Sequence, residues 1–79
     1  MSESDYIRAF GRNLVKAREA KNDLRQEDLA RKAHVNRASL SLIESGRRER
    51  GARLGTIYRL AEALDMDARD FLPEMEVEG

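Results

Sequence analysis

The 79-residue chain contains no cysteine, no tryptophan and a single proline, and it has no long hydrophobic run. The absence of cysteine excludes disulfides, thiolate catalysis and cysteine-based zinc sites, and it leads us to expect a cytoplasmic protein in a reducing environment. Because no window approaches the roughly eighteen apolar residues of a membrane helix, we expect no span across a bilayer. Charges are spread through the first 25 residues, so we expect no secretory signal peptide.

Few residues of this chain are suited to catalysis or to metal binding. His34 is the only histidine, and one histidine without cysteine or a carboxylate cluster cannot assemble a metal site. No nucleophile, base and orienting group come together in the sequence, so we expect neither an enzyme nor a bound cofactor. Residues 1–79 should form one small domain, and dimerisation would add to the limited stability of so small a core.

The charges cancel over the whole chain, but they are unevenly distributed. Fifteen Lys and Arg match fifteen Asp and Glu, which by itself argues against a nucleic-acid partner. Residues 8–59, however, hold fourteen basic against six acidic side chains, whereas residues 60–79 hold one basic against seven acidic side chains. A basic body with an acidic C-terminal end is typical of a protein that binds a polyanion, although such charges also occur simply as solubilising groups on helices.

The apolar periodicity and the helix-breaking residues predict an all-α protein with five helices. Ala, Leu, Arg and Glu dominate the composition, and apolar residues recur at intervals of three or four. Asn36 is a good N-cap, Gly46 supplies a left-handed C-terminal residue, and Asp67 with Asp70 forms a capping box ahead of Pro73. The expected helices cover about 4–21, 26–33, 37–45 and 54–64, followed by a short fifth helix that opens at Asp67.

Two short helices joined by a tight turn at 34–36 predict a helix-turn-helix over about 26–45. Its motifs are QEDLA (26–30) and VNRASLSLIESG (35–46), and LAEAL (60–64) follows in the fourth helix. Together they closely resemble the Xre (lambda repressor-like) helix-turn-helix family of five-helix DNA-binding domains, over about residues 10–72. Within that family, the segment 36–46 is most similar to the controller proteins of restriction-modification systems, whose recognition helix also begins with an acidic or amide residue followed by Arg.

The chain departs from the family pattern at several turns. Arg25 replaces the usual Ser or Thr before the second helix and cannot cap it. His34 stands where the family prefers a left-handed Gly, and the turn at Asn22 and Asp23 is longer than usual. The loop after Gly46 is also longer and lacks the familiar Pro, so the backbone contacts that the family makes there do not carry over.

The third helix is expected to turn one face inward and to leave the other free. With a step of about 100° per residue, Leu40 and Ile43 point inward, whereas Ala38, Leu42 and Ser45 point the opposite way. A leucine on the free face of so polar a chain has two interpretations. Leu42 either contacts thymine methyl groups in a major groove or is an ordinary exposed leucine.

The resemblance implies that the third helix enters the major groove of DNA. Arg37 lies in its first turn, where it either reads guanine O6 and N7 or contacts a phosphate. Gln26 matches the family position that binds the DNA backbone, and the loop arginines either contact phosphates or attract the duplex without fixed contacts. The expected DNA-binding residues are Gln26, Asn36, Arg37, Ala38, Ser39, Ser41, Leu42, Arg47, Arg48 and Arg50, with Arg53 as a further phosphate contact.

Two sets of structural contacts are expected, one within the protomer and one between protomers. The resemblance assigns Arg18 and Glu44 to a structural ion pair between the first and third helices, rather than to catalysis or DNA reading. A homodimer interface is expected along the fourth and fifth helices, because their apolar residues exceed what one small globule can bury. The dimer contacts that we expect are Tyr58, Phe71, Leu72 and Met75.

The sequence therefore predicts a transcriptional regulator that binds double-stranded DNA sequence-specifically, as a homodimer on a pseudo-palindromic operator. Whether it is a repressor or an activator stays open. One alternative is an antitoxin or another protein-interaction module of the same fold, whose acidic tail at 74–79 engages a basic partner. Another alternative is a DNA binder without sequence preference, for which specific and non-specific affinities would be equal.

Overall fold

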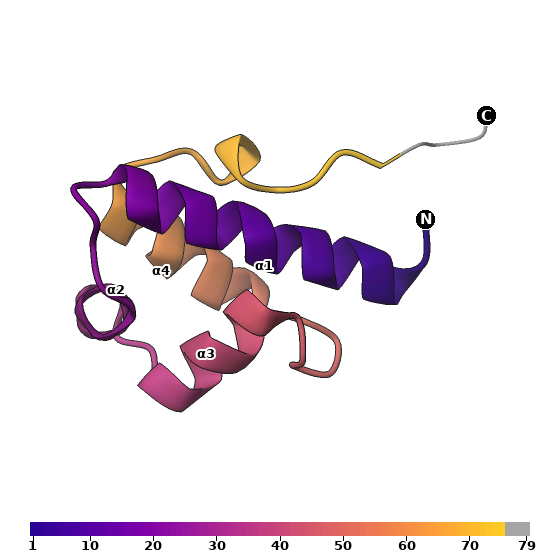
Figure 1. Ribbon diagram of the computed structural model, residues 1–79, viewed down its shortest axis with the longest axis horizontal. Helices are drawn as coiled ribbons and strands as arrows, with labels where there is room; N and C mark the ends of the chain where they lie inside the picture. Colours follow the sequence, from indigo (N-terminus) through magenta and orange to yellow (C-terminus); the bar gives the residue numbers. More distant parts are fainter. Residues whose placement is uncertain (76–79) are drawn as a thin grey trace.

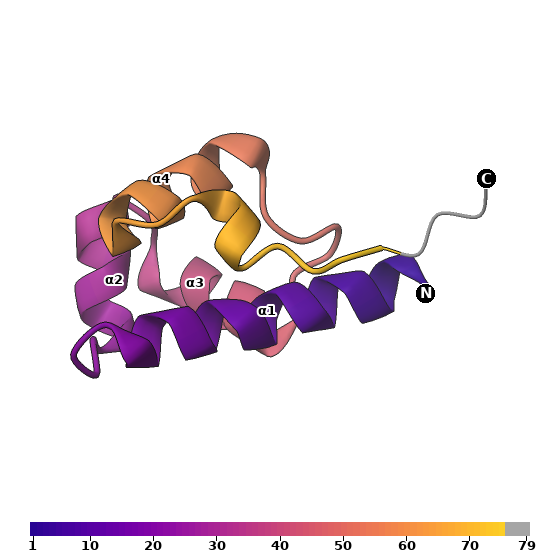
Figure 2. The ribbon, with the colours of Figure 1, turned by 90° about the horizontal axis from the view of Figure 1, so that it is seen from above.

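The computed structural model describes residues 1–75, and its secondary structure in that range is entirely helical. Figures 1 and 2 show α1 lying along one side of the molecule, with α2, α3 and α4 gathered against it and the C-terminal segment returning along α1. The expected acidic tail lies partly outside the described residues, because 76–79 are not among them. The elements are α1 (Glu3–Ala20), α2 (Gln26–Ala33), α3 (Arg37–Ser45), α4 (Leu54–Leu64) and the 3-10 turn η1 (Ala68–Asp70).

The expected count of five helices is not confirmed, because the described residues form four α-helices and the short fifth element is one turn of 3-10 helix. The expected capping box is present, since the Asp67 side chain accepts from the backbone of Arg69 and the Asp70 side chain accepts from that of Asp67. Pro73 follows so soon that the helix cannot continue, because proline lacks an N–H and disfavours helical backbone at the residue before it. The fifth element is therefore only three residues long.

Local capping explains where α1 begins and ends. Ser2 and Asp5 form a capping box, so the helix begins at Glu3, one residue earlier than expected. It ends at Ala20, and the following turn places Asn22 and Asp23 in the left-handed region, each with φ of 53°. Asn and Asp tolerate that conformation better than most residues, which accounts for the pair at this turn.

The helix-turn-helix has the bounds that its sequence predicts. The Asn36 Oδ1 accepts from the backbone N–H groups of Ala38 and Ser39, at 2.8 Å and 3.3 Å, and so caps α3. His34 adopts the left-handed conformation with φ of 55°, and Gly46 ends α3 with φ of 73°. These turns fix α2 and α3 as two short helices on either side of a sharp bend.

The core lies where α1, α2, α3 and α4 meet, and its largest fully buried side chains come from every one of these helices. Phe71 is also among them, with 1% of its surface exposed, and its ring centroid lies 5.8 Å from that of Phe10. The Asn13 amide donates to the Phe71 carbonyl at 3.1 Å, which holds the C-terminal segment on α1. The fully buried side chains are Leu14, Leu29, Leu40, Leu60, Leu64 and Phe71.

The burial of Phe71 corrects the expectation that it contacts a second protomer. The turn η1 brings the chain back across the top of the core, so the ring is covered by its own chain. Leu72 is only partly buried and packs on the edge of the same core. Sequence periodicity alone could not distinguish these two neighbours, because the covering contact comes from α1, far away in the chain.

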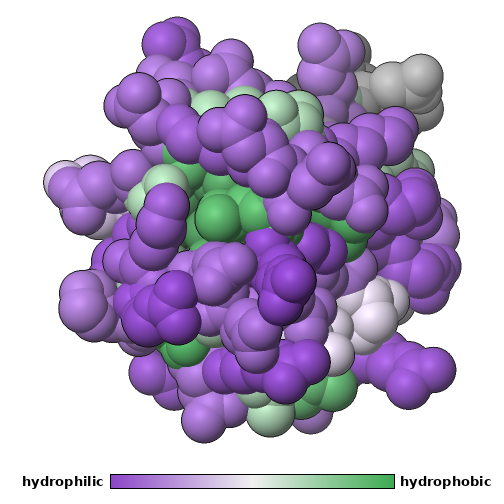
Figure 3. Space-filling model, turned by 60° about the vertical axis from the view of Figure 1, so that its left-hand side comes forward, coloured by the Kyte–Doolittle hydropathy of each residue, from purple (hydrophilic) through white to green (hydrophobic). Residues whose placement is uncertain are grey.

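The outer surface is mostly hydrophilic. On the face seen in Figure 3, hydrophilic residues dominate and hydrophobic residues reach the surface in one central area and in smaller areas below it. The large hydrophobic residues that are exposed among those described are Met1, Leu42, Leu54, Tyr58 and Met75. Within residues 1–75, none of the helices combines the length and the apolar character needed to cross a bilayer.

Candidate nucleic-acid interface

One side of α3 is buried and the other is open to solvent. Leu40 is fully buried and Ile43 is 2% exposed, so these two residues fix the helix on the core. Figure 1 shows α3 at the edge of the molecule opposite the C-terminal segment, so nothing in the described chain covers its outer side. The side chains exposed on that outer side are Arg37, Ala38, Ser41, Leu42 and Ser45.

The first turn of α3 combines an exposed cation with a side-chain cap. Arg37 is exposed, and its Nη1 lies 4.0 Å from an oxygen of Glu27, which is itself half exposed. An exposed ion pair at this distance contributes little stability, so Arg37 can leave it at small cost. The Asn36 oxygen is occupied by the cap, which leaves its amide nitrogen for an outside acceptor, and Ser39 is half-buried beside it.

A buried ion pair ties together the ends of three helices behind this surface. The Arg18 Nε donates to the Glu44 Oε2 at 2.8 Å, and the Arg18 Nη2 donates to the Glu44 Oε1 at 3.1 Å. The Arg18 Nη1 also donates to the Leu24 carbonyl at 2.8 Å. The two side chains are 14% and 5% exposed, and such bidentate pairs are strong and geometrically specific.

Gln26 joins the same network, a role that the sequence did not indicate. Its Nε2 donates to the Glu44 Oε1 at 2.8 Å, so one hydrogen of the amide is already used inside the protein. Gln26 is nevertheless the first residue of α2 and is half-buried, with its second hydrogen and its oxygen left for another partner. The ends of α1, α3 and the start of α2 therefore meet at one carboxylate.

Gly11 allows α1 to lie directly on the last turn of α3. A Cβ at this position would lie 2.5 Å from the carbonyl oxygen of Glu44 and 2.6 Å from that of Ile43. Only a residue without a side chain fits there, because both neighbours are backbone atoms that cannot move aside independently of the helix. The glycine thus sets the distance between α1 and the helix whose outer face is open.

The loop between α3 and α4 carries a concentration of arginines that bind no carboxylate. Within the part of the chain that the structure describes, Arg47, Arg48, Arg50 and Arg53 make no ion pair. The loop turns at Arg50 and Gly51, whose φ angles are both positive, 64° and 71°. A basic loop therefore flanks the C-terminal end of α3.

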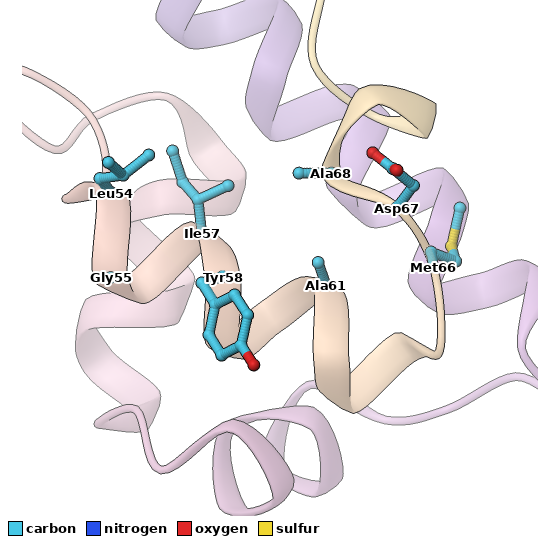
Figure 4. A pocket seen from close by; sticks show the side chains of 8 residues that line it. All are labelled: Leu54, Gly55, Ile57, Tyr58, Ala61, Met66, Asp67 and Ala68. Atoms are coloured by element: carbon cyan, nitrogen blue, oxygen red, sulfur yellow. The ribbon is translucent and has the colours of Figure 1, made fainter.

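An apolar depression lies between α4 and the segment of residues 66–68. It has a volume of about 650 Å³, and Leu54 and Tyr58 on its rim are 83% and 65% exposed. Figure 4 shows Ile57 and Ala61 extending from α4 and Ala68 facing them from the segment around η1. Of the expected dimer contacts, Tyr58 lines this depression, whereas Leu72 and Met75 do not. Leu54 was not among the expected dimer contacts, although an exposed apolar residue at the first position of a helix was a visible signal.

The carboxyl groups whose pKa values are shifted lie at helix starts rather than on the outer face of α3. The backbone N–H of Ser2 donates to the Asp5 carboxylate and, with the Ser2 hydroxyl and Arg8, lowers its pKa below the ordinary value. The Arg69 side chain donates to Asp67 and lowers the pKa of that carboxyl in the same way. Among the described residues, no group of three or more histidines and carboxylates could hold a metal ion.

The comparison with protein families agrees with this geometry. A family model described as helix-turn-helix matches residues 14–71, which is most of the chain. The chain therefore belongs to the Xre-like helix-turn-helix family, and it has the fold of DNA-binding transcription regulators. A search of curated proteins finds no match.

Two solved structures are similar to this chain over most of its length. The restriction-modification controller protein C.AhdI from Aeromonas hydrophila is 36% identical, with a TM-score of 0.75, over 85% of this chain and 96% of that protein. The hypothetical transcription factor NHTF from Neisseria is 29% identical, with a TM-score of 0.78, over 92% of this chain and 80% of that one. Both relatives are regulatory proteins rather than enzymes.

Proposed function

We propose that this protein regulates transcription by binding double-stranded DNA sequence-specifically, as a homodimer on a pseudo-palindromic operator. The outer face of α3 carries the proposal, because five exposed side chains project from a helix whose opposite side is buried in the core. A helix held in this way fits the major groove of B-DNA, which is wide enough to admit it. The names of the two similar structures, a controller protein and a transcription factor, support the same function.

The proposal assigns sequence reading to the first turns of α3. The Arg37 guanidinium matches the paired acceptors O6 and N7 of guanine, and Ala38 and Leu42 offer apolar contact to the methyl group of thymine. Ser39 and Ser41 can donate to base edges or to phosphates, and so can the Asn36 amide. These roles require direct contact with base edges, so they should change which sequence is bound.

The proposal assigns sequence-independent contacts to Gln26 and to the loop. The Gln26 amide keeps one hydrogen free for a phosphate beside the N-terminus of α2, where the helix dipole favours an anion. Arg47, Arg48 and Arg50 lie without a carboxylate partner in the described structure, next to the end of α3. Phosphate contacts of this kind position the protein on any duplex and make its affinity fall with salt.

The homodimer is supported by the apolar depression on α4. Leu54 and Tyr58 expose large apolar surface there, and a second copy of the chain would cover it. A two-fold dimer would then place two α3 helices about 34 Å apart on one side of the duplex, which requires half-sites about one helical turn apart. Sedimentation at tens of micromolar should show a dimer, and Leu54→Arg should convert it to a monomer. A wild-type monomer at that concentration would contradict this part of the proposal.

The decisive experiment combines footprinting with replacement of Arg37. Footprinting on the DNA upstream of the protein's own gene should reveal a protected pseudo-palindrome. Arg37→Ala should then weaken binding to that operator by about 1–3 kcal/mol per half-site, while binding to random DNA scarcely changes. Arg31→Ala, on the neighbouring helix α2, is a matched control that should leave both affinities unchanged.

Three results would contradict the proposal in different ways. Equal weakening of operator and random DNA by Arg37→Ala would make Arg37 a phosphate contact rather than a base reader. A ratio of specific to non-specific affinity near one in the wild type would indicate a binder without sequence preference. A protein that binds no DNA and co-purifies with a partner bound at the depression around Leu54 would instead be a protein-interaction module.

A further inference from the structure

Glu27 lies between two arginines at the place where the starts of α2 and α3 approach each other. Its Oε1 is 3.8 Å from the Arg25 Nη1, and its Oε2 is 4.0 Å from the Arg37 Nη1. Within residues 1–75, no other carboxylate oxygen lies within 4.0 Å of Arg37. A carboxylate of α2 therefore reaches across the helix-turn-helix to the arginine in the first turn of α3.

Asp28, the next residue, is paired in a different way. Its Oδ1 accepts from the Arg31 Nη2 at 2.9 Å, so this carboxylate is bound within α2. Glu27 and Asp28 both lie in the first turn of α2, where the helix dipole favours negative charge. That preference is the simplest reason for an acid at either position, but it does not account for the contact of Glu27 with α3. The two acids therefore form a matched pair that differs in the partner.

The contact between Glu27 and Arg37 is loose enough to be exchanged for another. Both arginine contacts of Glu27 are longer than a hydrogen bond, so they are attractions between charges rather than fixed bonds. The side chains of Arg37 and Glu27 are 69% and 52% exposed, and an ion pair so open to water is weak. Another acceptor can therefore replace the carboxylate at Arg37, but it has to compete with the carboxylate to do so.

A carboxylate in this place acts differently on the two kinds of acceptor that a duplex offers to Arg37. A phosphate is an anion, so Glu27 repels it and competes with it for the same cation. The guanine edge is neutral, and its O6 and N7 accept two hydrogen bonds from one guanidinium. The carboxylate therefore disfavours a phosphate contact by Arg37 more than a base contact. Specificity is a difference of affinities, and repulsion of the wrong partner increases it as well as attraction to the right one does.

We propose that Glu27 is a specificity-determining residue, because its carboxylate beside Arg37 disfavours phosphate contact by that arginine. It lowers the affinity for random duplex more than the affinity for the operator, and so raises the ratio between the two. The inference rests on the proposed function, in which α3 reads an operator through Arg37. It adds to the outer face of α3 a residue of α2 that needs no contact with DNA of its own.

The first measurement compares Glu27→Gln with Asp28→Asn on the footprinted operator and on random duplex. Glu27→Gln releases Arg37 to bind a phosphate, so the affinity for random duplex should rise about fivefold, the upper range for an exposed ion pair. The operator affinity should rise less than about twofold, because Arg37 is already bound to guanine there. The logarithmic salt slope on random duplex should increase by up to about one unit, for one additional phosphate contact. Asp28→Asn removes the same charge from the same turn, so it should change both affinities by one common factor and leave their ratio unchanged.

Two further variants separate the contact with Arg37 from a general effect of charge. Glu27→Asp keeps the charge at the start of α2 but shortens the side chain, and Arg37 is already 4.0 Å away. It should therefore lower the affinity ratio as Glu27→Gln does, by a smaller factor. In an Arg37→Ala background, Glu27→Gln should change both affinities by one common factor, as Asp28→Asn does. The ratio is insensitive to any loss of folded protein, because such a loss lowers both affinities alike.

The outcomes separate the inference from the proposed function. An equal change of the ratio in Glu27→Gln and Asp28→Asn, or a change that persists without Arg37, would overturn the inference and leave the proposed function intact. A selective loss of operator affinity in Glu27→Gln would also overturn it, since Glu27 would then itself accept from a cytosine amino group. A wild type that binds operator and random duplex equally would contradict the proposed function and the inference together.

Discussion

The network around Glu44 and the loop of residues 47–53 adjoin in sequence, yet they differ in whether their charged side chains are paired inside the protein. Glu44 is 8% exposed, and its oxygens accept from both Arg18 and Gln26. In the loop, none of the arginines has a carboxylate partner among the described residues. The charges that are paired inside the protein hold helix ends together, whereas the loop arginines are open to solvent and available to a partner from outside the chain.

The largest expected effect comes from breaking the hydrogen-bonded network around Glu44. Glu44→Ala leaves the Arg18 guanidinium buried without its counterion and removes the acceptor of Gln26. We expect the free energy of unfolding to fall by about 3 kcal/mol, because an unpaired buried charge is strongly unfavourable. Urea unfolding followed by the helical circular dichroism signal measures the change.

The matched control is Glu49→Ala, which removes an exposed carboxylate from the loop. Its free energy of unfolding should stay within about 0.5 kcal/mol of the wild type. A Glu44→Ala protein with an unchanged unfolding midpoint but without sequence discrimination would show that Glu44 acts in recognition instead.

A somewhat smaller effect is expected from forcing α1 away from α3. Gly11→Ala places a Cβ 2.5 Å from the Glu44 carbonyl oxygen, so the two helices must separate. We expect a loss of about 1–3 kcal/mol in thermal or urea unfolding, as for overpacked sites in general. Gly55→Ala is the control, because its Cβ meets only an ordinary contact at 3.8 Å. It should gain up to about 1 kcal/mol from improved helix propensity, and a comparable loss there would contradict the role of close approach.

Removing arginine charges from the loop of residues 47–53 should change DNA binding without changing stability. Arg47→Gln combined with Arg50→Gln should reduce the logarithmic salt slope for random duplex by up to about two units, one for each arginine that binds a phosphate. The free energy of unfolding should change by no more than about 0.5 kcal/mol. Lys16→Gln, exposed on α1, should alter neither quantity. A stability loss as large as that of Glu44→Ala would show that the loop arginines also maintain the fold.

The smallest effect concerns the capping carboxylates, which are paired but exposed. Because the pKa of Asp5 is lowered in the folded protein, its contribution to stability is present above the ordinary aspartate pKa of about 3.9. It is lost as the pH falls through the lower folded value. Unfolding midpoints of the wild type and Asp5→Asn should therefore differ at pH 6 and converge once the pH lies below the lowered folded pKa of Asp5. A difference that persists into strong acid would point to a cause other than ionisation.

The sequence was sufficient to predict the helices whose ends are fixed locally. Asn36 and Gly46 mark the ends of α3, and both act through their own backbone or side chain within a few residues. The left-handed conformation of His34 and the uncapped start of α2 at Arg25 follow from the same local rules. These features need no knowledge of the distant chain, which is why the bounds of α2, α3 and α4 were predictable.

The sequence could not predict features that depend on contacts across the fold. Phe71 has the character of a dimer contact in the sequence, but Phe10 and the returning C-terminal segment bury it. The bond from Gln26 to Glu44 joins residues eighteen positions apart, and the contact of Arg59 with Ala33 joins residues twenty-six apart. Of the candidate site, the exposed face of α3 was predictable from helix geometry, whereas the contact of Gln26 with the buried ion pair was not.

The division of α3 into an inner and an outer side has a consequence for how its target preference can change. Leu40, Ile43 and Glu44 secure the helix, and none of them belongs to the five-residue outer side. Substitutions at the outer positions can therefore accumulate with little penalty to folding, since they leave the core and the buried ion pair intact. We expect a combinatorial library at these positions to yield folded proteins with diverged operator preferences. Under the proposed function, one scaffold could thus serve several different operators through a few changes on the outer side of α3.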